Sequence, residues 1–376
     1  MATNMASPIR LPMVDLSDPD TAAAGKALLN AAIEYGFLYI DSRTSKFTER
    51  DVERVFKMSS DFFKLPSAEK EPYRRGSDNK GWVGMHVETL DPENHEVGIS
   101  GETSKSKTPF DVLIPFMPKS PPRALNIGEL DDGKVQQALP PTLLSQENEI
   151  SHFTRLCNET CAQILKLLSQ GLEIPENFFT SRHDPSKGST GNSLRLLYYP
   201  SDVSSFRPEK DIRAGAHSDY GSITLLFQCP GQPGLEILTP DQTWAPVPVY
   251  PGDLVKYPFP PILVNIGDML SYWTDGLLKS TVHRVVFPRE MPESSELGPR
   301  DRYSIAFFCQ PVGSTELVPV PSKLVENYRE AQNKDPNKSF IVGYGGGANS
   351  LDSDQPRMTA GEHLQSRLNA TYLKSI

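Results

Sequence analysis

The spacing of hydrophobic positions changes near residue 190 of the chain. Before that point apolar residues recur at three and four positions, and after it they gather in short runs. The longest helical pattern spans Glu147 to Gln170, and Gly171 follows it. Its apolar stripe consists of Ile150, Phe153, Cys157, Cys161, Ile164 and Leu168. This spacing predicts a long helix that packs with one face against a sheet.

Two further helices are predicted nearer the N-terminus. One spans Ala22 to Tyr35 and ends at Gly36, a residue type that favours the position just after a helix. The other spans Val52 to Phe63, ahead of Pro66. Short strands are expected at Leu11–Leu16 and Phe37–Ile40, on either side of the first helix.

From residue 194 onward the chain has a β-rich texture, with glycine and proline between the runs. The predicted strands are Leu194–Tyr199, Ser222–Gln228, Leu235–Leu238, Trp244–Val249, Leu263–Ile266, Thr281–Phe287 and Tyr303–Gln310. Short strands at such spacing are typical of a sandwich or barrel. Near the C-terminus, Thr359 and Glu362 form a capping-box pattern that predicts a last helix. We expect one compact unit, with a helical or mixed region at residues 1–150 and the long helix, β core and final helix at residues 151–376.

Composition and charge narrow the function classes. The 376 residues carry a net charge of -9, which disfavours nucleic-acid and anionic-membrane partners because both reward basic surfaces. No apolar stretch approaches the roughly 20 residues of a membrane span, and the N-terminus lacks the order of a signal peptide. Four cysteines in a chain of this length do not suggest a disulfide framework. We therefore expect a cytoplasmic protein.

The candidate chemistry begins with a histidine and a carboxylate. His217 and Asp219 are two positions apart on an extended segment, so both side chains can reach one metal from one strand. His283, in a later β-branched run, would complete a two-histidine, one-carboxylate iron site that leaves coordination positions open. The spacing alone is a weak signal, because seven histidines and 47 acidic residues give about one such pair by chance. His86 and Glu88 form a second pair.

Motifs in a fixed order strengthen the first pair. The motifs are Ala216–Gln228, Val264–Leu270, Lys279–Val285 and Arg302–Ser304. They resemble the isopenicillin-N-synthase-like family of iron(II)/2-oxoglutarate-dependent dioxygenases. Leu11–Leu16, Gly36–Phe37 and Phe62–Pro66 resemble the N-terminal part of that family, so the resemblance covers most of the chain.

The resemblance implies a mainly β fold with flanking helices and a double-stranded β-helix (jelly-roll) core. It implies Fe(2+) on His217, Asp219 and His283, with O2 and 2-oxoglutarate as cosubstrates. Oxidative decarboxylation to succinate would accompany hydroxylation, desaturation or rearrangement of a small organic molecule. No catalytic side chain is expected beyond the metal ligands.

The resemblance also assigns a cosubstrate site. Arg302 and Ser304 would bind the distal carboxylate of 2-oxoglutarate, which a planar guanidinium can grip with two parallel hydrogen bonds. Tyr199 matches a family tyrosine that also donates to the cosubstrate. Leu197 stands where the family often has asparagine, so that contribution is missing.

Other departures from the family concern loops. The segments Pro246–Pro261 and Phe287–Arg300 are longer than usual, and Gly84–Gly101 has the character of a lid. We expect these loops to shape the substrate pocket. Together with Phe307 and Phe308 they favour a small, partly apolar substrate, such as an intermediate of secondary metabolism.

Two alternatives remain open at this point. An iron oxidase of the same fold could use Arg302 and Ser304 to hold a substrate carboxylate and need no 2-oxoglutarate. A non-catalytic jelly-roll binding protein is the other alternative, and the intact set of metal-binding residues disfavours it.

Overall fold

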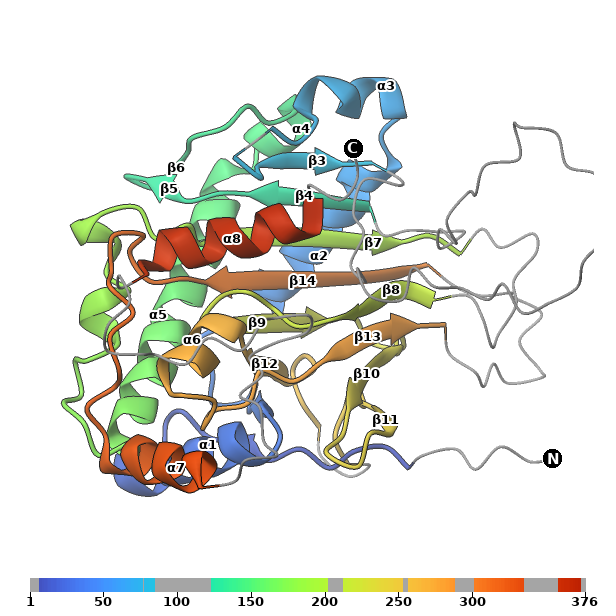
Figure 1. Cartoon of the computed structure of the whole chain (residues 1–376). Coiled ribbons are helices and arrows are strands. Elements are labelled where there is room, and N and C mark those ends of the chain that lie inside the picture. The colour runs from blue at the N-terminus through green and yellow to red at the C-terminus, as the bar shows by residue number, and fades with distance from the viewer. Residues whose placement is uncertain are drawn as a thin grey trace, which may run out of the picture.

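A computed structural model describes residues 7–76, 78–84, 123–201, 212–252, 256–287, 301–334 and 358–372. Two sheets form its centre (Figure 1). The larger sheet contains β1 (Met13–Val14), β2 (Phe37–Ile40), β3 (Gly81–Val83), β4 (Arg123–Ile127), β7 (Ser193–Tyr199), β9 (Ile223–Gln228), β12 (Ile262–Ile266) and β14 (Arg302–Cys309). The smaller sheet contains β8 (Ile212–His217), β10 (Leu235–Leu238), β11 (Trp244–Pro246) and β13 (His283–Val286).

The larger sheet has the order β1-β2-β12-β9-β14-β7-β4-β3, and the smaller sheet has the order β11-β10-β13-β8. All pairings are antiparallel except that of β1 with β2. A separate ribbon joins β5 (Leu130–Asp131) and β6 (Lys134–Val135). Strands from the predicted N-terminal region extend both edges of the large sheet, and the proposed division at residue 150 lies within a helix.

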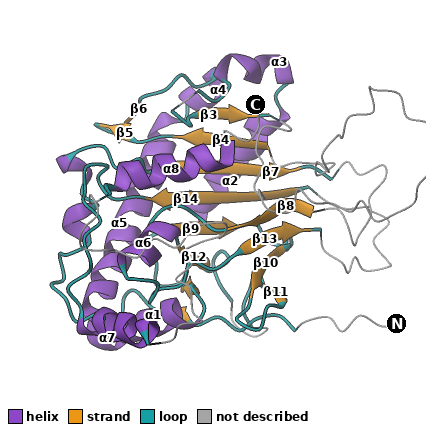
Figure 2. Ribbon diagram, in the orientation of Figure 1, coloured by secondary structure: helices purple, strands orange, loops and turns teal. Residues whose placement is uncertain are grey.

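Helices cover one face of the large sheet (Figure 2). The described helices are α1 (Thr21–Glu34), α2 (Glu49–Lys64), α3 (Ser67–Lys70), α4 (Pro141–Leu144), α5 (Glu147–Gly171), α6 (Asp268–Trp273), α7 (Lys323–Asn333) and α8 (Ala360–Tyr372), with short 3-10 turns at Glu71–Tyr73, Thr180–Arg182 and Pro185–Lys187. Of these, α1 and α2 pack on α5, and α2 and α5 pack on β14. Within these described ranges, no helix combines the length and apolar character needed to cross a membrane.

Strand alternation divides the hydrophobic core into two layers. On β14, Ile305 and Phe307 face the helices and join the larger core cluster. A second cluster lies between the two sheets, where Tyr39 and Leu263 of the large sheet meet Ile237 of the small sheet. The residues of β14 that alternate with these, Arg302, Ser304, Ala306 and Phe308, point into the space between the sheets. The fold is therefore a jelly roll with helices on its outer face, as expected.

The exit from α1 helps to fix the region around His283. Gly36 has a φ of +67°, and a Cβ there would lie 2.2 Å from the backbone oxygen of Lys279. The hydroxyl of Thr281 donates to the backbone oxygen of Tyr35 at 2.6 Å. The helix end thus packs directly on the segment that leads into His283, which requires a residue without a side chain.

Most predicted elements are present with small changes in their bounds, but several were not anticipated. The strand expected at Trp244–Val249 ends at Pro246, although the backbone N–H of Val247 still donates to the Leu235 oxygen. Elements that the hydrophobic pattern did not reveal include β3, β4, β8, α6 and α7. The capping box at the start of α8 is confirmed, since the Glu362 carboxylate accepts from the backbone and hydroxyl of Thr359.

Candidate metal and cosubstrate site

The candidate metal ligands converge at one end of the space between the sheets. His217 is the last residue of β8, His283 is the first residue of β13, and the two are paired in register. Asp219 lies two residues beyond the end of β8, so the expectation that it shares a strand with His217 is wrong. The chain nevertheless returns its carboxylate to the same place. One ligand atom from each of the three residues lies within 4.8 Å of the other two.

Backbone carbonyls orient both imidazoles. The Nδ1 atom of His217 lies 2.8 Å from the oxygen of Gly215, and that of His283 lies 3.1 Å from the oxygen of Thr281. A carbonyl can only accept, so Nδ1 carries the proton and Nε2 keeps its lone pair in each neutral ring. Phe37 packs edge-on against His283, with ring centroids 5.5 Å apart. Both Nε2 atoms are therefore free to bind a metal ion.

The Asp219 carboxylate is held by two side chains from the large sheet. Its Oδ2 accepts from the hydroxyl of Thr224 at 2.6 Å and from the amide of Asn265 at 2.7 Å. Its Oδ1 lies 3.8 Å from the Nε2 atom of His283. One oxygen is thus fixed by hydrogen bonds while the other faces the imidazoles.

The protonation states match those that a metal requires. Burial, followed by the neighbouring His283, lowers the pKa of His217 to about 4. Burial would raise the pKa of Asp219, but His283, His217 and the two hydrogen bonds together hold it below its ordinary value. At neutral pH the site therefore offers a neutral His217 imidazole and an ionised carboxylate, which are the forms that bind Fe(II). This donor set fits the expected metal.

The predicted cosubstrate residues lie together on β7 and β14, two neighbouring strands of the large sheet. Arg302 and Ser304 are each 1% exposed, and the guanidinium donates from Nη1 to the Ser304 hydroxyl at 3.2 Å. Tyr199 is paired with Arg302 in the β7–β14 register, and its ring lies 5.1 Å from the guanidinium carbon. The Nε atom of Arg302 has no hydrogen-bond partner within the described part of the chain. A buried guanidinium with unused donors is suited to a ligand carboxylate.

Leu197 lies opposite Ser304 on β7. This is the position at which the resembling family often has asparagine. It belongs to the group of partly buried hydrophobic residues that pack on the inter-sheet core. Its side chain offers no hydrogen bond, so this flank of Ser304 is apolar.

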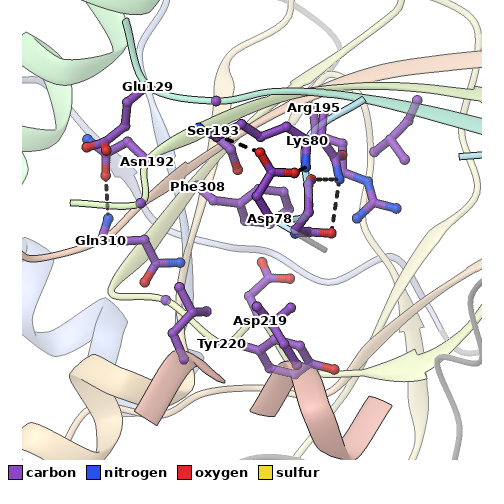
Figure 3. Close-up of a pocket in the computed structure, with 18 of the residues that line it drawn as sticks. Asp78, Lys80, Glu129, Asn192, Ser193, Arg195, Asp219, Tyr220, Phe308 and Gln310 are labelled. Atoms are coloured by element: carbon purple, nitrogen blue, oxygen red, sulfur yellow. Dashed lines mark hydrogen bonds and ion pairs between the residues drawn. The ribbon is translucent and has the colours of Figure 1, made fainter. Parts of the chain in front are cut away.

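A cavity of about 340 Å³ adjoins the metal site. His217, Asp219 and Tyr199 contribute to its wall, and Leu364 and Leu368 of α8 close another side. Figure 3 shows Arg195, Lys80 and Asp78 toward one side, Gln310 and Asn192 toward another, and Asp219 and Tyr220 along the lower edge of the view. The space next to the candidate iron is therefore bordered by many polar groups.

The cavity has only one of the two phenylalanines from which a partly apolar substrate was expected in its described wall. Phe308 lines the cavity, but Phe307 is fully buried in the core on the opposite face of β14. The reason is the two-residue period of a strand, which sends neighbouring side chains to opposite faces. Among the polar lining residues, Gln310 and Asn126 each keep a buried side-chain oxygen without a partner in the described ranges.

Several site residues escaped the sequence reasoning. Thr224 and Asn265 lie within the recognised motifs, and their spacing from the ligands was the available signal. Lys80, Arg195 and Leu368 are far apart in sequence and come together only through the fold. The predicted lid residues 85–101, with His86 and His95, and residues 288–300 of the second insertion lie outside the described residues.

Comparisons with known proteins agree with this geometry. The family model of the 2OG-Fe(II) oxygenase superfamily matches residues 190–311, and the model of the non-haem dioxygenase in morphine synthesis N-terminal region matches residues 11–113. The UPF0676 protein C1494.01 of Schizosaccharomyces pombe is 32% identical over 97% of this chain and 93% of its own. The 2-oxoglutarate-Fe(II) type oxidoreductase ppzD of Metarhizium majus is 30% identical over 76% of this chain and 78% of its own.

Two solved structures are similar to this chain in fold. A full-length Neurospora crassa protein in complex with alpha-KG has a TM-score of 0.68, is 26% identical and is covered over 95% of each chain. The complex of that protein with alpha-KG and thymine also has a TM-score of 0.68, with 25% identity over 96% of each chain. The Fe(2+), 2-oxoglutarate and O2 expected from the motifs are the cofactor and cosubstrates of such enzymes. The chain belongs to the 2OG-Fe(II) oxygenase superfamily and is a 2-oxoglutarate-dependent dioxygenase.

Proposed function

We propose that His217, Asp219 and His283 hold the Fe(II) of this dioxygenase. The observation that carries the proposal is the convergence of their ligand atoms within 4.8 Å, with each imidazole oriented by a backbone carbonyl. A two-histidine, one-carboxylate site leaves positions open for a cosubstrate and for O2. Bound iron supplies the oxygen chemistry, and the chain binds, orients and shields the reactants.

The cosubstrate site in this proposal consists of Arg302, Ser304 and Tyr199. The distal carboxylate of 2-oxoglutarate binds the Arg302 guanidinium, whose buried Nε is unused, and receives a hydrogen bond from the Ser304 hydroxyl. The Tyr199 ring contacts the guanidinium and limits where the cosubstrate can lie. Burial strengthens these charge-assisted hydrogen bonds because water does not compete for them.

The cavity favours a compact organic substrate that carries both polar and apolar groups. Its volume of about 340 Å³ suits a small molecule, and Arg195, Asn126 and Gln310 border it with hydrogen-bonding groups. Phe308 adds one aromatic face. The presence of thymine in the related Neurospora crassa structure supports a small substrate of this character. Polar secondary metabolites belong to the same class, whereas nucleic-acid polymers do not fit the proposal.

Four free cysteines support the remaining part of the proposal, a reducing cytoplasmic location. None of Cys157, Cys161, Cys229 and Cys309 forms a disulfide. Disulfide-free proteins are typical of reducing compartments.

The experiment measures succinate released by the Fe(II)-loaded protein while candidate substrates are supplied one at a time. The panel contains thymine, related pyrimidines, amino acids and small polar secondary metabolites. We expect one member of the panel to be oxidised and to raise succinate release by an equal molar amount. Asp219→Ala should abolish both the oxidation and the succinate release. Product formation that continues without 2-oxoglutarate would favour the oxidase alternative. A protein that binds no Fe(II) would favour the non-catalytic one.

A further inference from the structure

Gln228 is a buried polar residue to which no function has so far been assigned. It is the last residue of β9 and lies directly opposite Ser304 in the β9–β14 register. Directly opposed residues in an antiparallel pair share one face of the sheet, with Cβ atoms roughly 5 Å apart. The Gln228 side chain therefore points into the space between the sheets, beside the proposed cosubstrate site.

The hydrogen-bonding capacity of this side chain is unused. Gln228 is 1% exposed, and neither its Oε1 nor its Nε2 has a hydrogen-bond partner in the described part of the chain. Native proteins seldom bury a carboxamide with both ends unpaired, because each lost hydrogen bond to water is costly. Such a group is a candidate for contact with a ligand.

The neighbours of Gln228 indicate which ligand group could bind its unpaired amide. Arg302, also 1% exposed, lies two residues before Ser304 on β14 and keeps its own Nε unpaired within the described ranges. The unused donors of Gln228 and Arg302 therefore flank the Ser304 hydroxyl on one face of two adjacent strands. A carboxylate accepts hydrogen bonds only and can take several of them, so it matches this set of donors.

We propose that Gln228 is a further cosubstrate-binding residue, whose amide donates to the distal carboxylate of 2-oxoglutarate. This inference rests on the proposed function of Arg302 and Ser304. Ser304 has a different neighbour on each side: Leu197 on β7 is apolar, and Gln228 on β9 is polar. The carboxylate is accordingly held from the β14 and β9 side.

The test compares Gln228→Leu with the unchanged protein. Both are loaded with Fe(II), kept free of oxygen and titrated calorimetrically with 2-oxoglutarate. We expect the Kd for 2-oxoglutarate to rise about ten-fold or more, as for a lost hydrogen bond to a charged group. The Kd for 2-oxobutyrate, which lacks the distal carboxylate, should not change. The metal-free variant should be at least as heat-stable as the parent, because the apolar side chain removes an unpaired buried amide.

Thr154→Val is the matched control, because Thr154 is 6% exposed on α5 and its hydroxyl is likewise unpaired in the described ranges. It should leave 2-oxoglutarate binding unchanged. Gln228→Met provides a second apolar variant if the leucine does not fold.

Unchanged 2-oxoglutarate affinity in both Gln228 variants would overturn the inference, as would equal weakening of 2-oxoglutarate and 2-oxobutyrate. Arg302→Leu separates this failure from failure of the proposed function. If Arg302→Leu weakens 2-oxoglutarate binding and the Gln228 variants do not, only the role of Gln228 is wrong. If Arg302→Leu has no effect either, the proposed cosubstrate site itself is wrong.

Discussion

His217 and His283 face each other across β8 and β13, with their ring centroids 4.3 Å apart. Two imidazoles at this distance would repel each other if both were protonated. Burial and this neighbour accordingly lower the pKa of His217 to about 4. The pair is suited to share one metal cation rather than to carry two protons.

Removal of a proposed ligand should abolish metal binding. We expect His217→Ala and Asp219→Ala to lose most of their Fe(II), because two remaining ligands cannot hold the ion with the same affinity. Iron content after anaerobic loading and desalting is the measurement. His152→Ala is the control, since that exposed histidine on α5 is remote from the site. Full iron occupancy in Asp219→Ala would contradict the assignment.

The hydrogen bonds to Asp219 should also influence metal affinity. Thr224→Val removes the 2.6 Å hydrogen bond to Oδ2 and preserves the side-chain shape. Loss of such an outer contact typically weakens metal binding about 10- to 100-fold. Competition with a metal-binding dye measures the effect, and an unchanged affinity would show that Asn265 alone orients the carboxylate.

Arg302→Lys should weaken cosubstrate binding although it keeps the positive charge. Lysine is a point charge that lacks the planar fork of donors. We expect the KM for 2-oxoglutarate to rise about ten-fold or more, with iron content unchanged. The measurement is succinate formation across a range of 2-oxoglutarate concentrations. An increase confined to the KM of the organic substrate would indicate that Arg302 binds that substrate instead.

Stability of the metal-free protein should fall at acidic pH because of His183. Its Nδ1 lies 2.8 Å from the Phe179 oxygen and its Nε2 2.9 Å from the Ser222 hydroxyl, and burial lowers its pKa to about 4. The unfolded chain binds the proton at higher pH than the folded one, so stability is full above about pH 6.5 and is lost toward pH 4.

The loss attributable to His183 is about 3 kcal/mol. Urea unfolding at several pH values measures it, and His183→Gln should have a shallower dependence on pH between about 4 and 6.5. The slope should not vanish, because burial also lowers the pKa of His363 to about 4. An identical slope in parent and variant would refute the role of His183.

An ion pair with a buried carboxylate joins α8 to the first residue of α6. The Arg367 guanidinium lies 2.7 Å from Oδ2 of Asp268, and the Asp268 side chain is 1% exposed. Arg367→Ala would leave this carboxylate buried without its partner, which typically costs about 3–5 kcal/mol. Urea unfolding measures the loss in the free energy of unfolding. Adding Asp268→Asn to the variant should restore part of that free energy. No restoration would show that the two residues act independently.

The sequence was most informative where local pattern and packing agree. The stripe on α5 and the apolar runs of β9, β12 and β14 were recognisable because each element presents a continuous apolar face to the core. By contrast, β8 contains the low-propensity run Arg213-Ala214-Gly215-Ala216 and forms through pairing with β13. Tertiary contacts decide its structure.

The site was predictable to a similar extent. The motifs pointed to the candidate metal ligands and to Arg302, whose proposed chemistry depends on residue type and spacing. The cavity wall was not predictable, because Lys80, Arg195 and Leu368 belong to three different elements or connections. Gln228 lay within a recognised motif, but its unpaired state within the described ranges is visible only when its neighbours on β14 are in place.

The most direct test of the central claim is the binding of 2-oxoglutarate to the intact protein without oxygen, with and without Fe(II). We expect one molecule bound per chain when iron is present, and much weaker binding when iron is absent or when His283 is replaced by alanine. Admitting oxygen together with a substrate from the panel should then convert the bound 2-oxoglutarate to succinate. Binding of equal strength with and without iron, or no succinate once oxygen and that substrate are supplied, would contradict an Fe(II)-assisted 2-oxoglutarate site at His217, Asp219 and His283.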